Sequence, residues 1–432
     1  MFKSLTALFL LLLPAAALAQ EPPPLEVDVV GGQQGNQPVA VPAMAGDSAT
    51  GRNISAVIAS DLRFTGVLSP IGPTGIRGLE VGEVTRPDHA YWNRAGATAL
   101  VSGQVDPLPG GRIQVSCYLF DTVTRLELER QGYAVEAGDW RRAAHKCADM
   151  VYARLTGEQP FLDTRVVYVA ETGPKNNRVK RIALMDSDGT NHRYLTDGSY
   201  TVVTPRFSPD GRRLVYMSYK GRRPRARIMD LVTGEDRLLV PGTAFTFAPR
   251  FSPDGRNVVF SMGTLGNSDI YVVSVNGGEP RRLTTAPGVD TSPSYSPDGR
   301  RIVFESDRSG SQQLYVMDAD GSQQRRISFG GGQYASPSWS PRGDLIAYTR
   351  IGGGAFRIGV MNPSGRNARL LTNSWQDEGP SWAPNGQFVM FHRTQQGSGE
   401  ASLYAVPING GQPRLMPTPL GGSDPSWSPL KN

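Results

Sequence analysis

The chain has 432 residues, of which 39% are hydrophobic and 19% charged, so it can build a sizeable core and is long enough for two or three domains. Its 50 glycines and 34 prolines favour a turn-rich β architecture over a helical bundle. The net charge of +6 is spread along the chain without compact basic runs, which argues against nucleic-acid binding. Two cysteines exclude a disulfide-rich scaffold, and four histidines without paired spacing argue against a catalytic zinc.

Residues 1–19 have the features of a signal peptide. Lys3 provides a positive start, residues 5–13 are apolar, and Ala17-Leu18-Ala19 is a small-x-small cleavage site. The apolar stretch is shorter than the ~20 residues that cross a bilayer as a helix. No cysteine follows the cleavage site, and no second apolar run of transmembrane length occurs. We therefore expect an exported, periplasmic protein without direct membrane insertion.

From residue 165 onwards, two short phrases repeat with a nearly constant period. A Gly followed by Arg-Leu-Thr or a close variant recurs six times from Gly189 to Gly410. Steps of 43–45 residues also separate the aromatic residues of a Pro-x-aromatic-Ser-Pro phrase, which are Phe207, Phe251, Tyr295, Trp339, Trp382 and Trp427. Units of ~40–50 residues with four strands each are typical of β-propeller blades. The 268 residues from Arg165 to Asn432 accommodate six blades.

Each period contains the signals of four short strands. Ser252-Pro253-Asp254-Gly255 predicts a type I turn, and strands are expected at 257–261, 269–273 and 281–284. The last copy stops after its aromatic phrase, whereas the first copy begins at Arg165 without one. Pairing of the C-terminal strand with the first three strands would complete one blade and cover both open edges. We therefore predict a six-bladed propeller over residues 165–432 that its C-terminal strand closes.

Residues 20–160 predict a small α/β domain ahead of the propeller. Two segments have apolar residues at helical spacing and are predicted to be helices. Asp139 is a good N-cap for the second helix, which ends at Gly157. The predicted elements are strands at 38–42, 99–105, 112–121 and 126–135 and helices at 54–62 and 140–155.

No group of residues predicts catalysis. A propeller that covers a serine peptidase needs a Gly-x-Ser-x-Gly elbow in an α/β-hydrolase domain, and the sequence contains no such elbow. Asp210, Asp254 and Asp298 recur at equivalent turn positions, so turn formation explains them better than acid–base chemistry. We therefore predict that the protein is not an enzyme.

The succession of a signal peptide, a short α/β domain and a propeller with Ser-Pro-Asp-Gly turns resembles the TolB family, the periplasmic component of the Tol-Pal system. The likeness covers essentially the whole mature chain. It rests on residues 54–62 before the turn at Gly66, the strand at 99–105 and the closing phrase at 425–429. The resemblance implies a non-enzymatic adaptor between the inner-membrane protein TolA and the outer-membrane lipoprotein Pal, which supports outer-membrane integrity and invagination during cell division.

The propeller mouth is the expected binding face. Within each blade, the repetitive turns that follow the first and the third strand lie on one face of the propeller. The variable loops, which connect the second strand to the third and each blade to the next, therefore lie on the opposite face. This opposite face is here called the mouth. Variable loops on a rigid scaffold favour binding. The loops between blades carry aromatic residues that resemble interface anchors, with packing between blades as the alternative. These residues are Tyr200, Phe245, Phe247, Tyr334 and Trp375.

The resemblance places Pal binding at this mouth. The matching loop positions are Phe245, Ala248, Thr291 and Ser292, where Phe245 and Ser292 replace a histidine and a glutamate of the family. Carboxylates in the same loops favour either a bipolar protein partner or a calcium ion, with solvated loop charge as the alternative. They are Asp197, Asp290, Asp377, Glu378 and Asp424. No other cofactor is expected.

The start of the mature chain, residues 20–32, is predicted to be a mobile segment that engages TolA. Pro22-Pro23-Pro24 favours an extended conformation, and Gly31-Gly32 supplies a hinge. Between them, Leu25, Glu26, Val27, Asp28, Val29 and Val30 alternate loosely, as in a strand that adds to a partner's sheet. The resemblance implies that this stretch binds TolA, and a plain first strand of the small domain is the alternative.

The two cysteines lie on faces that are expected to meet. Cys117 alternates with Val115 and Leu119 on a strand, and Cys147 lies on the apolar face of the helix at 140–155. An oxidising compartment permits a disulfide between them, and two buried free thiols are the alternative.

Two other classes of function remain open at this point. One is an exported propeller that binds a small ligand or supports a hydrolase, and the other is a binder of cell-wall glycan. Capture of a Pal-like lipoprotein from an envelope extract favours the adaptor, whereas activity on peptide or ester substrates favours the hydrolase.

Overall fold

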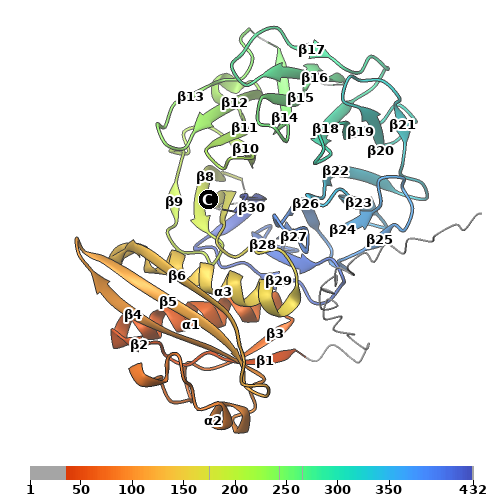
Figure 1. Cartoon of the computed structure of the whole chain (residues 1–432). Helices are drawn as coiled ribbons and strands as arrows, with labels where there is room; N and C mark the ends of the chain where they lie inside the picture. The colour runs from red at the N-terminus through yellow and green to blue at the C-terminus, as the bar shows by residue number, and fades with distance from the viewer. Residues whose placement is uncertain (1–35, 175, 243, 265, 431–432) are drawn as a thin grey trace, which may run out of the picture. The chain divides into compact units, whose positions relative to one another are not determined.

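The computed structural model describes residues 36–174, 176–242, 244–264 and 266–430. A mixed α/β domain is followed by a ring of six four-stranded sheets (Figure 1). The predicted fold class, a six-bladed β-propeller behind a small α/β domain, is confirmed. The predicted signal peptide and the segment at 20–32 lie outside the described residues. Within the described part of the chain, no helix is both long and apolar enough to cross a membrane.

The α/β domain contains one sheet with the order β3-β1-β4-β5-β6, in which β2 pairs with β4. The first strand, β1, runs parallel to β3 and β4, and β4, β5 and β6 form an antiparallel meander. The strands are β1 (Gln37–Ala40), β2 (Ala45–Gly46), β3 (Leu68–Ile71), β4 (Ala99–Leu108), β5 (Arg112–Asp121) and β6 (Glu127–Glu136). The helices are α1 (Ser48–Thr65), η1 (Val81–Glu83), α2 (His89–Arg94), η2 (Ala137–Asp139) and α3 (Trp140–Thr156).

The two long helices begin in different ways. The carboxylate of Asp47 accepts hydrogen bonds from the backbone N–H groups of Ala49 and Thr50, so α1 has a side-chain cap. Asp139 precedes α3 as predicted, but its side chain makes no capping bond. The reason is η2, which ends at Asp139 and leaves that residue at φ −96° and ψ 15° instead of extended. The predicted capping bond at Asp139 is therefore wrong.

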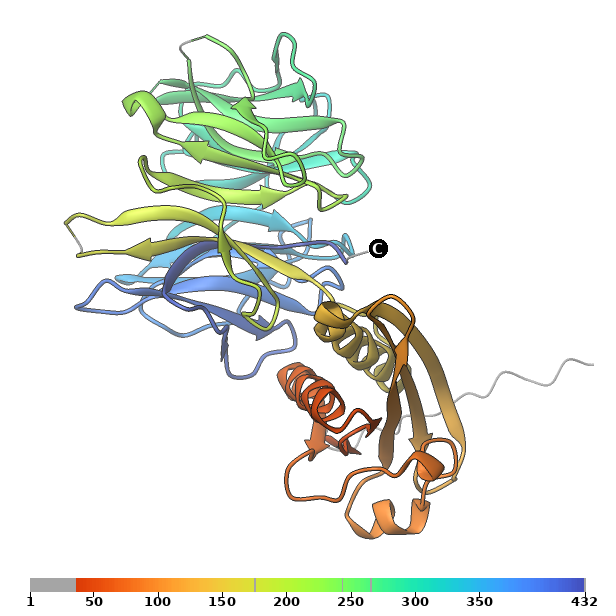
Figure 2. The same cartoon turned by 90° about the vertical axis from the view of Figure 1, so that its left-hand side faces the viewer.

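Side chains of β4 and β5 alternate between two apolar layers. Val101 and Val115 face α1 and α3, which cover one side of the sheet (Figure 2). Leu100 and Phe120 point to the opposite side and pack against Trp92 of α2. This two-sided burial follows from the two-residue period of a strand.

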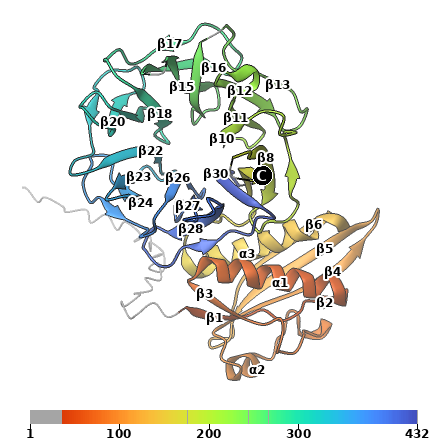
Figure 3. The same ribbon diagram turned by 180° about the vertical axis from the view of Figure 1, so that it is seen from behind.

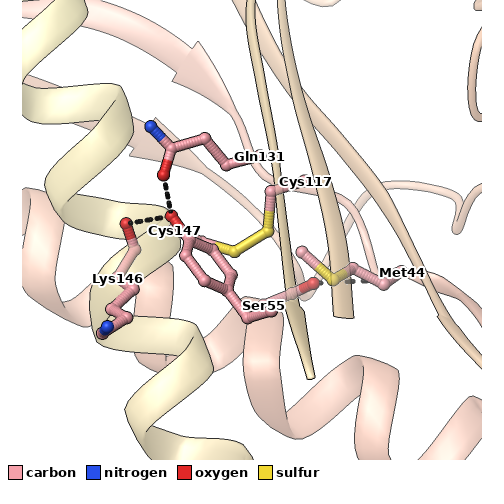
Figure 4. Close-up of a disulfide and its surroundings, with 7 residues drawn as sticks. Met44, Ser55, Cys117, Gln131, Lys146 and Cys147 are labelled. Atoms are coloured by element: carbon pink, nitrogen blue, oxygen red, sulfur yellow. Dashed lines mark hydrogen bonds between the residues drawn. A yellow bond between two sulfur atoms is a disulfide. The ribbon is translucent and has the colours of Figure 1, made fainter. Parts of the chain in front are cut away.

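A disulfide joins the sheet to α3. The structure links Cys117 of β5 to Cys147 of α3, with 6.1 Å between their Cα atoms (Figure 4). Both side chains are fully buried. Beside them, the Tyr133 hydroxyl of β6 donates to Gln131 Oε1 at 2.6 Å and reaches the Lys146 carbonyl at 3.2 Å. The strand face and the helix face therefore meet as the sequence pattern predicts.

Five blades are formed by consecutive strands, from the channel outwards. Each is an antiparallel sheet whose first strand lines the channel and whose last strand is two or three residues long. The strands are β10 (Val202–Phe207), β11 (Arg213–Ser218), β12 (Arg225–Asp230) and β13 (Asp236–Leu238); β14 (Phe245–Phe251), β15 (Asn257–Thr264), β16 (Asn267–Ser274) and β17 (Arg281–Arg282); β18 (Asp290–Tyr295), β19 (Arg301–Ser306), β20 (Gln313–Asp318) and β21 (Arg325–Arg326); β22 (Gln333–Trp339), β23 (Ile346–Gly352), β24 (Ala355–Met361) and β25 (Arg369–Leu370); β26 (Asp377–Trp382), β27 (Phe388–Thr394), β28 (Ala401–Pro407) and β29 (Arg414–Leu415). A short helix, η3 (Lys220–Arg222), lies between β11 and β12.

The sixth blade combines the two ends of the propeller sequence (Figure 3). Strand β30 (Gly421–Trp427) pairs antiparallel with β7 (Arg165–Thr172), which continues into β8 (Val179–Asp186) and β9 (Arg193–Tyr194). The Trp427 indole also donates to Thr164 Oγ1 at 2.8 Å. The ring is thus closed by hydrogen bonds between segments more than 250 residues apart.

An aromatic cluster joins the α/β domain to the propeller. Phe64 at the end of α1 stacks on Phe388 with 5.6 Å between ring centroids, and Phe161 stacks on the same ring at 5.2 Å. Trp427 meets Phe161 edge-on at 5.9 Å. Because Trp427 and Phe388 flank repetitive Ser-Pro-type turns, the small domain packs on the face opposite the mouth.

An ionic cluster lies beside these rings. His145 Nδ1 of α3 is 2.6 Å from Asp61 of α1, and both residues are buried. Its Nε2 is 3.6 Å from Asp188, in the turn between β8 and β9, and Arg141 binds the same carboxylate at 2.7 Å. Two charged side chains of α3 therefore pair with the propeller through a single aspartate.

Candidate functional site

The repetitive turns opposite the mouth are structural. In each Ser-Pro-Asp-Gly turn the serine hydroxyl and a backbone N–H donate to the aspartate, as in Ser252 and Arg256 with Asp254. These hydrogen bonds lower the pKa values of Asp254 and Asp298 against a smaller effect of burial. At Asp210 burial is the largest single influence and raises the pKa, but the matching hydrogen bonds and nearby arginines together outweigh it and lower the pKa. The carboxylates therefore act as fixed acceptors that hold the turn.

Every innermost strand has a β-bulge at the same position. The residue before the first proline of each Pro-x-aromatic phrase has a positive φ between 45° and 68°, and the register with the second strand shifts there. Five of the six are not glycine, although a left-handed conformation costs such residues ~1–2 kcal/mol. The six are Thr204, Ala248, Ser292, Ser336, Gly379 and Asp424. This conformation turns the backbone N–H towards the neighbouring blade.

Polar side chains of neighbouring blades receive several of these N–H groups. Ser336 N–H donates to Glu305 Oε2 at 2.6 Å, and Thr204 N–H donates to Asp424 Oδ2 at 3.2 Å. Asp424 N–H in turn lies 3.3 Å from His392 Nδ1. Burial raises the pKa of Glu305 to about 7, and the bond from Ser336 opposes that rise. The channel wall just below the mouth is therefore polar and tied together between blades.

Apolar side chains surround this polar wall at the mouth. Tyr200, Trp375 and Leu420 occupy one equivalent position, five residues before the repeat proline, in three successive blades. Trp375 is 43% exposed and Leu420 is 44% exposed, whereas Tyr200 is half-buried against its blade core, with Lys220 5.5 Å from its ring. In the next blade Phe245 meets Phe247 edge-on at 6.5 Å. The mouth thus offers a discontinuous arc of apolar contact sites.

Comparison with known proteins identifies the family. Residues 25–128 match the TolB amino-terminal domain and residues 152–431 match the TolB beta propeller domain. The chain is 58% identical to the Tol-Pal system protein TolB of Rhizorhabdus wittichii, over 99% of this chain and 98% of that protein. It is 65% identical to the protein of the same name from Sphingopyxis alaskensis, over 88% and 84% of the two chains. This chain belongs to the TolB family.

A solved structure agrees with this assignment. The crystal structure of TolB from Acinetobacter baumannii superimposes with a TM-score of 0.81 and 26% identity, over 91% of this chain and 97% of that one. The TolB family is periplasmic, and its curated relatives are named as Tol-Pal system proteins. The protein is a non-enzymatic member of the family, in agreement with the sequence prediction.

In this TolB chain, the predicted aromatic residues do not all lie at the surface or in loops. Phe245 and Phe247 belong to β14 and Tyr334 to β22, because the innermost strands extend further towards the mouth than the sequence pattern indicates. Tyr334 is only 4% exposed; it packs against Tyr348 and donates to the Phe329 carbonyl at 3.0 Å. Tyr334 is therefore a packing residue, and its prediction as an exposed anchor is wrong.

The matching residues Ala248, Thr291 and Ser292 are part of the inner wall of the propeller. Ala248 and Ser292 are bulge residues, and the Thr291 hydroxyl accepts a hydrogen bond from Ser261 at 3.1 Å. Sequence reasoning missed Phe329, which is 65% exposed in a loop between blades under the Arg326 guanidinium. The sequence could have indicated this exposure, because Phe329 directly precedes Gly330-Gly331-Gly332 and belongs to no apolar strand pattern.

The five mouth carboxylates do not converge. Arg308 pairs with Asp290 at 2.6 Å, and Arg393 pairs with Asp377 at 2.7 Å. The other three carboxylates accept hydrogen bonds from neutral groups. The donors are Ser199 N–H to Asp197, the Gln376 amide to Glu378 and Thr204 N–H to Asp424. In the described part of the chain, no group of three or more His, Cys, Asp or Glu residues is placed to hold a metal ion. The arrangement therefore gives no support to calcium at the mouth.

Proposed function

We propose that the protein is a periplasmic adaptor of the Tol-Pal system, exported by cleavage after Ala19, which binds the lipoprotein Pal at the propeller mouth and TolA through residues 20–32. Family membership supports the general role. The single observation that carries the Pal site is the arc of exposed apolar side chains on the face opposite the α/β domain. Because the aromatic cluster of Phe64, Phe161 and Phe388 occupies the other face, the mouth is accessible while the two domains remain packed.

The mouth has the composition of a protein interface. Trp375, Leu420 and Phe329 expose apolar surface, and Trp and Phe are enriched in interface cores. They lie above a polar wall whose carboxylates either pair with arginines or already accept hydrogen bonds, so a partner need not supply donors to them. Lys220 and Arg222 add positive charge at the rim, which favours an acidic edge on the partner.

The Pal site can be tested with charged substitutions at two positions. Trp375→Asp and Phe245→Asp should each weaken Pal binding by more than ~1–2 kcal/mol, or about tenfold in Kd, because a charge replaces an apolar contact at the centre of the interface. Isothermal titration calorimetry with the soluble domain of Pal measures the change.

The matched control is Val232→Asp. Val232 is 72% exposed but lies in a turn on the opposite face, so this substitution should leave the affinity unchanged. Equal affinities for wild type, Trp375→Asp and Phe245→Asp, with circular dichroism spectra unchanged, would exclude the mouth as the Pal site.

The TolA site is tested by removal of residues 20–32 from the mature protein. The truncated protein should lose TolA binding, since the alternating stretch from Leu25 to Val30 is the element proposed to add to TolA. Its melting temperature and Pal affinity should stay close to those of the full mature chain. Capture of TolA at full strength by the truncated protein would refute the assignment.

A further inference from the structure

A cavity of about 400 Å³ lies on the propeller axis at the end opposite the mouth. All six copies of the Pro-x-aromatic-Ser-Pro phrase line it, so it is the floor of the channel. The variable residue x of the phrase occupies equivalent places around this floor. These six residues are Arg206, Arg250, Ser294, Ser338, Ser381 and Ser426.

The serines and the arginines at these places do different things. Ser294 Oγ accepts the backbone N–H of Trp339 at 3.2 Å, and Ser381 Oγ accepts that of Trp427 at 3.1 Å. Each of these bonds connects one blade to the next. A guanidinium has no acceptor and cannot make such a bond. Arginine at positions 206 and 250 is therefore not required by the repeat geometry.

The two arginines lie on neighbouring strands, β10 and β14, and differ in their partners. Arg206 is buried, and its Nη1 donates to the carbonyls of Pro205, Pro425 and Asp424 at 2.8–3.3 Å. The side chain of Arg250 forms neither a hydrogen bond nor an ion pair with any residue that the structure describes. Among the described residues that line the cavity, these two arginines are the only charged ones.

Burial lowers the pKa of Arg250, and the positive charge of Arg206 lowers it further. Burial also lowers the pKa of Arg206, although the nearby Asp424 opposes this effect. Arg250 is half-buried and has no counter-ion among the described residues, and the like charge of Arg206 beside it destabilises the fold. An anion in the cavity would offset this cost.

We propose that the channel floor binds a small oxyanion with at least two negative charges between Arg206 and Arg250. The planar guanidinium of Arg250 has all its donors available for paired hydrogen bonds to phosphate or carboxylate oxygens. The hydroxyl groups of Ser338 and Ser426 line the same cavity and add donors. The site lies at the opposite end of the channel from the mouth, so it is independent of the proposed Pal interface.

The test variant is Arg250→Ser, because four of the six equivalent positions already hold serine and the blade accommodates it. Isothermal titration calorimetry at low ionic strength uses two probes, inorganic phosphate and citrate, which separate a phosphate site from a carboxylate site. The matched control, Arg256→Ser, removes the same charge from an exposed position in the adjacent turn. Melting curves with and without each probe report binding independently.

Wild type and Arg256→Ser should bind at least one probe with Kd values within about twofold of each other, and Arg250→Ser should bind it at least about tenfold more weakly. Without a probe, Arg250→Ser should melt no lower than wild type, because it removes an unpaired charge. Wild type that binds neither probe would overturn the proposal. So would equal binding by wild type and Arg250→Ser, or an equal loss in both variants.

Discussion

Single side chains differ in how strongly the surrounding fold controls their charge, and His145 shows this most clearly. Burial alone would lower the pKa of His145, but the carboxylates of Asp61 and Asp188 outweigh it and raise the pKa to about 9. The folded state therefore holds a proton that the unfolded chain releases near its ordinary pKa of ~6.5. This stabilisation is fully present below the unfolded pKa and is lost as the pH rises through the folded value.

We expect the free energy of unfolding to fall by about 2 kcal/mol between pH 7 and pH 9.5 through His145. His145→Gln cannot bind the proton, so its stability should change less over this range. Urea denaturation at several pH values measures the slope.

His89→Gln is the matched control for this experiment. Burial lowers the pKa of His89, so this side chain is neutral throughout the range from pH 7 to pH 9.5. The control should keep the slope of the wild type. A slope that His145→Gln does not reduce would contradict the ion pair.

The candidate site shows which residue roles can be predicted from a sequence. Trp375 was predicted as an interface anchor because it is an aromatic residue in a variable loop between blades, and its side chain is 43% exposed. Tyr334 has the same composition signal but lies in a strand, where its ring is buried and its hydroxyl finds a carbonyl. The left-handed backbone conformation of Ala248 and Ser292 could not be predicted from the sequence, because neither residue type favours it. The cluster of Asp61, His145 and Asp188 joins residues from three distant segments, and no local pattern predicts it.

Among the larger elements, repetition made the blades predictable. Two phrases in constant phase identify turns, and the turns delimit the strands, so six blades follow from their spacing. The α/β domain has no repeat, and five of its short elements, which are β2, β3, η1, α2 and η2, went unpredicted. Strand β2 has two residues, and α2 has six, so neither is long enough to show a period. Only Asp88, whose carboxylate accepts Tyr91 N–H at 2.9 Å, marks the start of α2.

The disulfide between β5 and α3 allows a prediction at this scale. The two cysteines are 30 residues apart in the sequence, and we propose that they are oxidised in the exported protein. A loop of that length corresponds to about 3–4 kcal/mol of stabilisation by restriction of the unfolded chain. The double variant Cys117→Ala, Cys147→Ala should therefore lose about that much free energy of unfolding.

Two measurements accompany the double variant. Mass spectrometry of the unreduced protein should show the loss of two hydrogens, and reduced wild type should resemble the variant in stability. Labelling of both thiols without reductant, together with unchanged stability of the variant, would refute the bond.

Considered as a whole, the molecule couples its two domains through a few aromatic rings and the ionic cluster around Asp188. Phe64→Ala removes one ring from the stack on Phe388 and should cost about 3 kcal/mol, the lower end of the range for Phe→Ala, because this ring is only partly buried. Because the contact lies between domains, calorimetry should show the unfolding of the α/β domain separating from that of the propeller. Phe329→Ala, at an exposed ring, should leave the transition unchanged. A single unshifted transition for Phe64→Ala would show that other contacts hold the domains together.

The pairing of β30 with β7 also determines when this protein can become complete during biosynthesis. The sixth blade needs residues 421–427, so three of its strands stay without their innermost neighbour until that segment has been synthesised. The same strand brings Trp427 to Phe161, so this part of the contact between the domains also waits for it. A polypeptide that a nonsense mutation ends before Gly421 lacks both features at once. Such a product exposes the inner edge of β7, whose unpaired backbone groups favour aggregation.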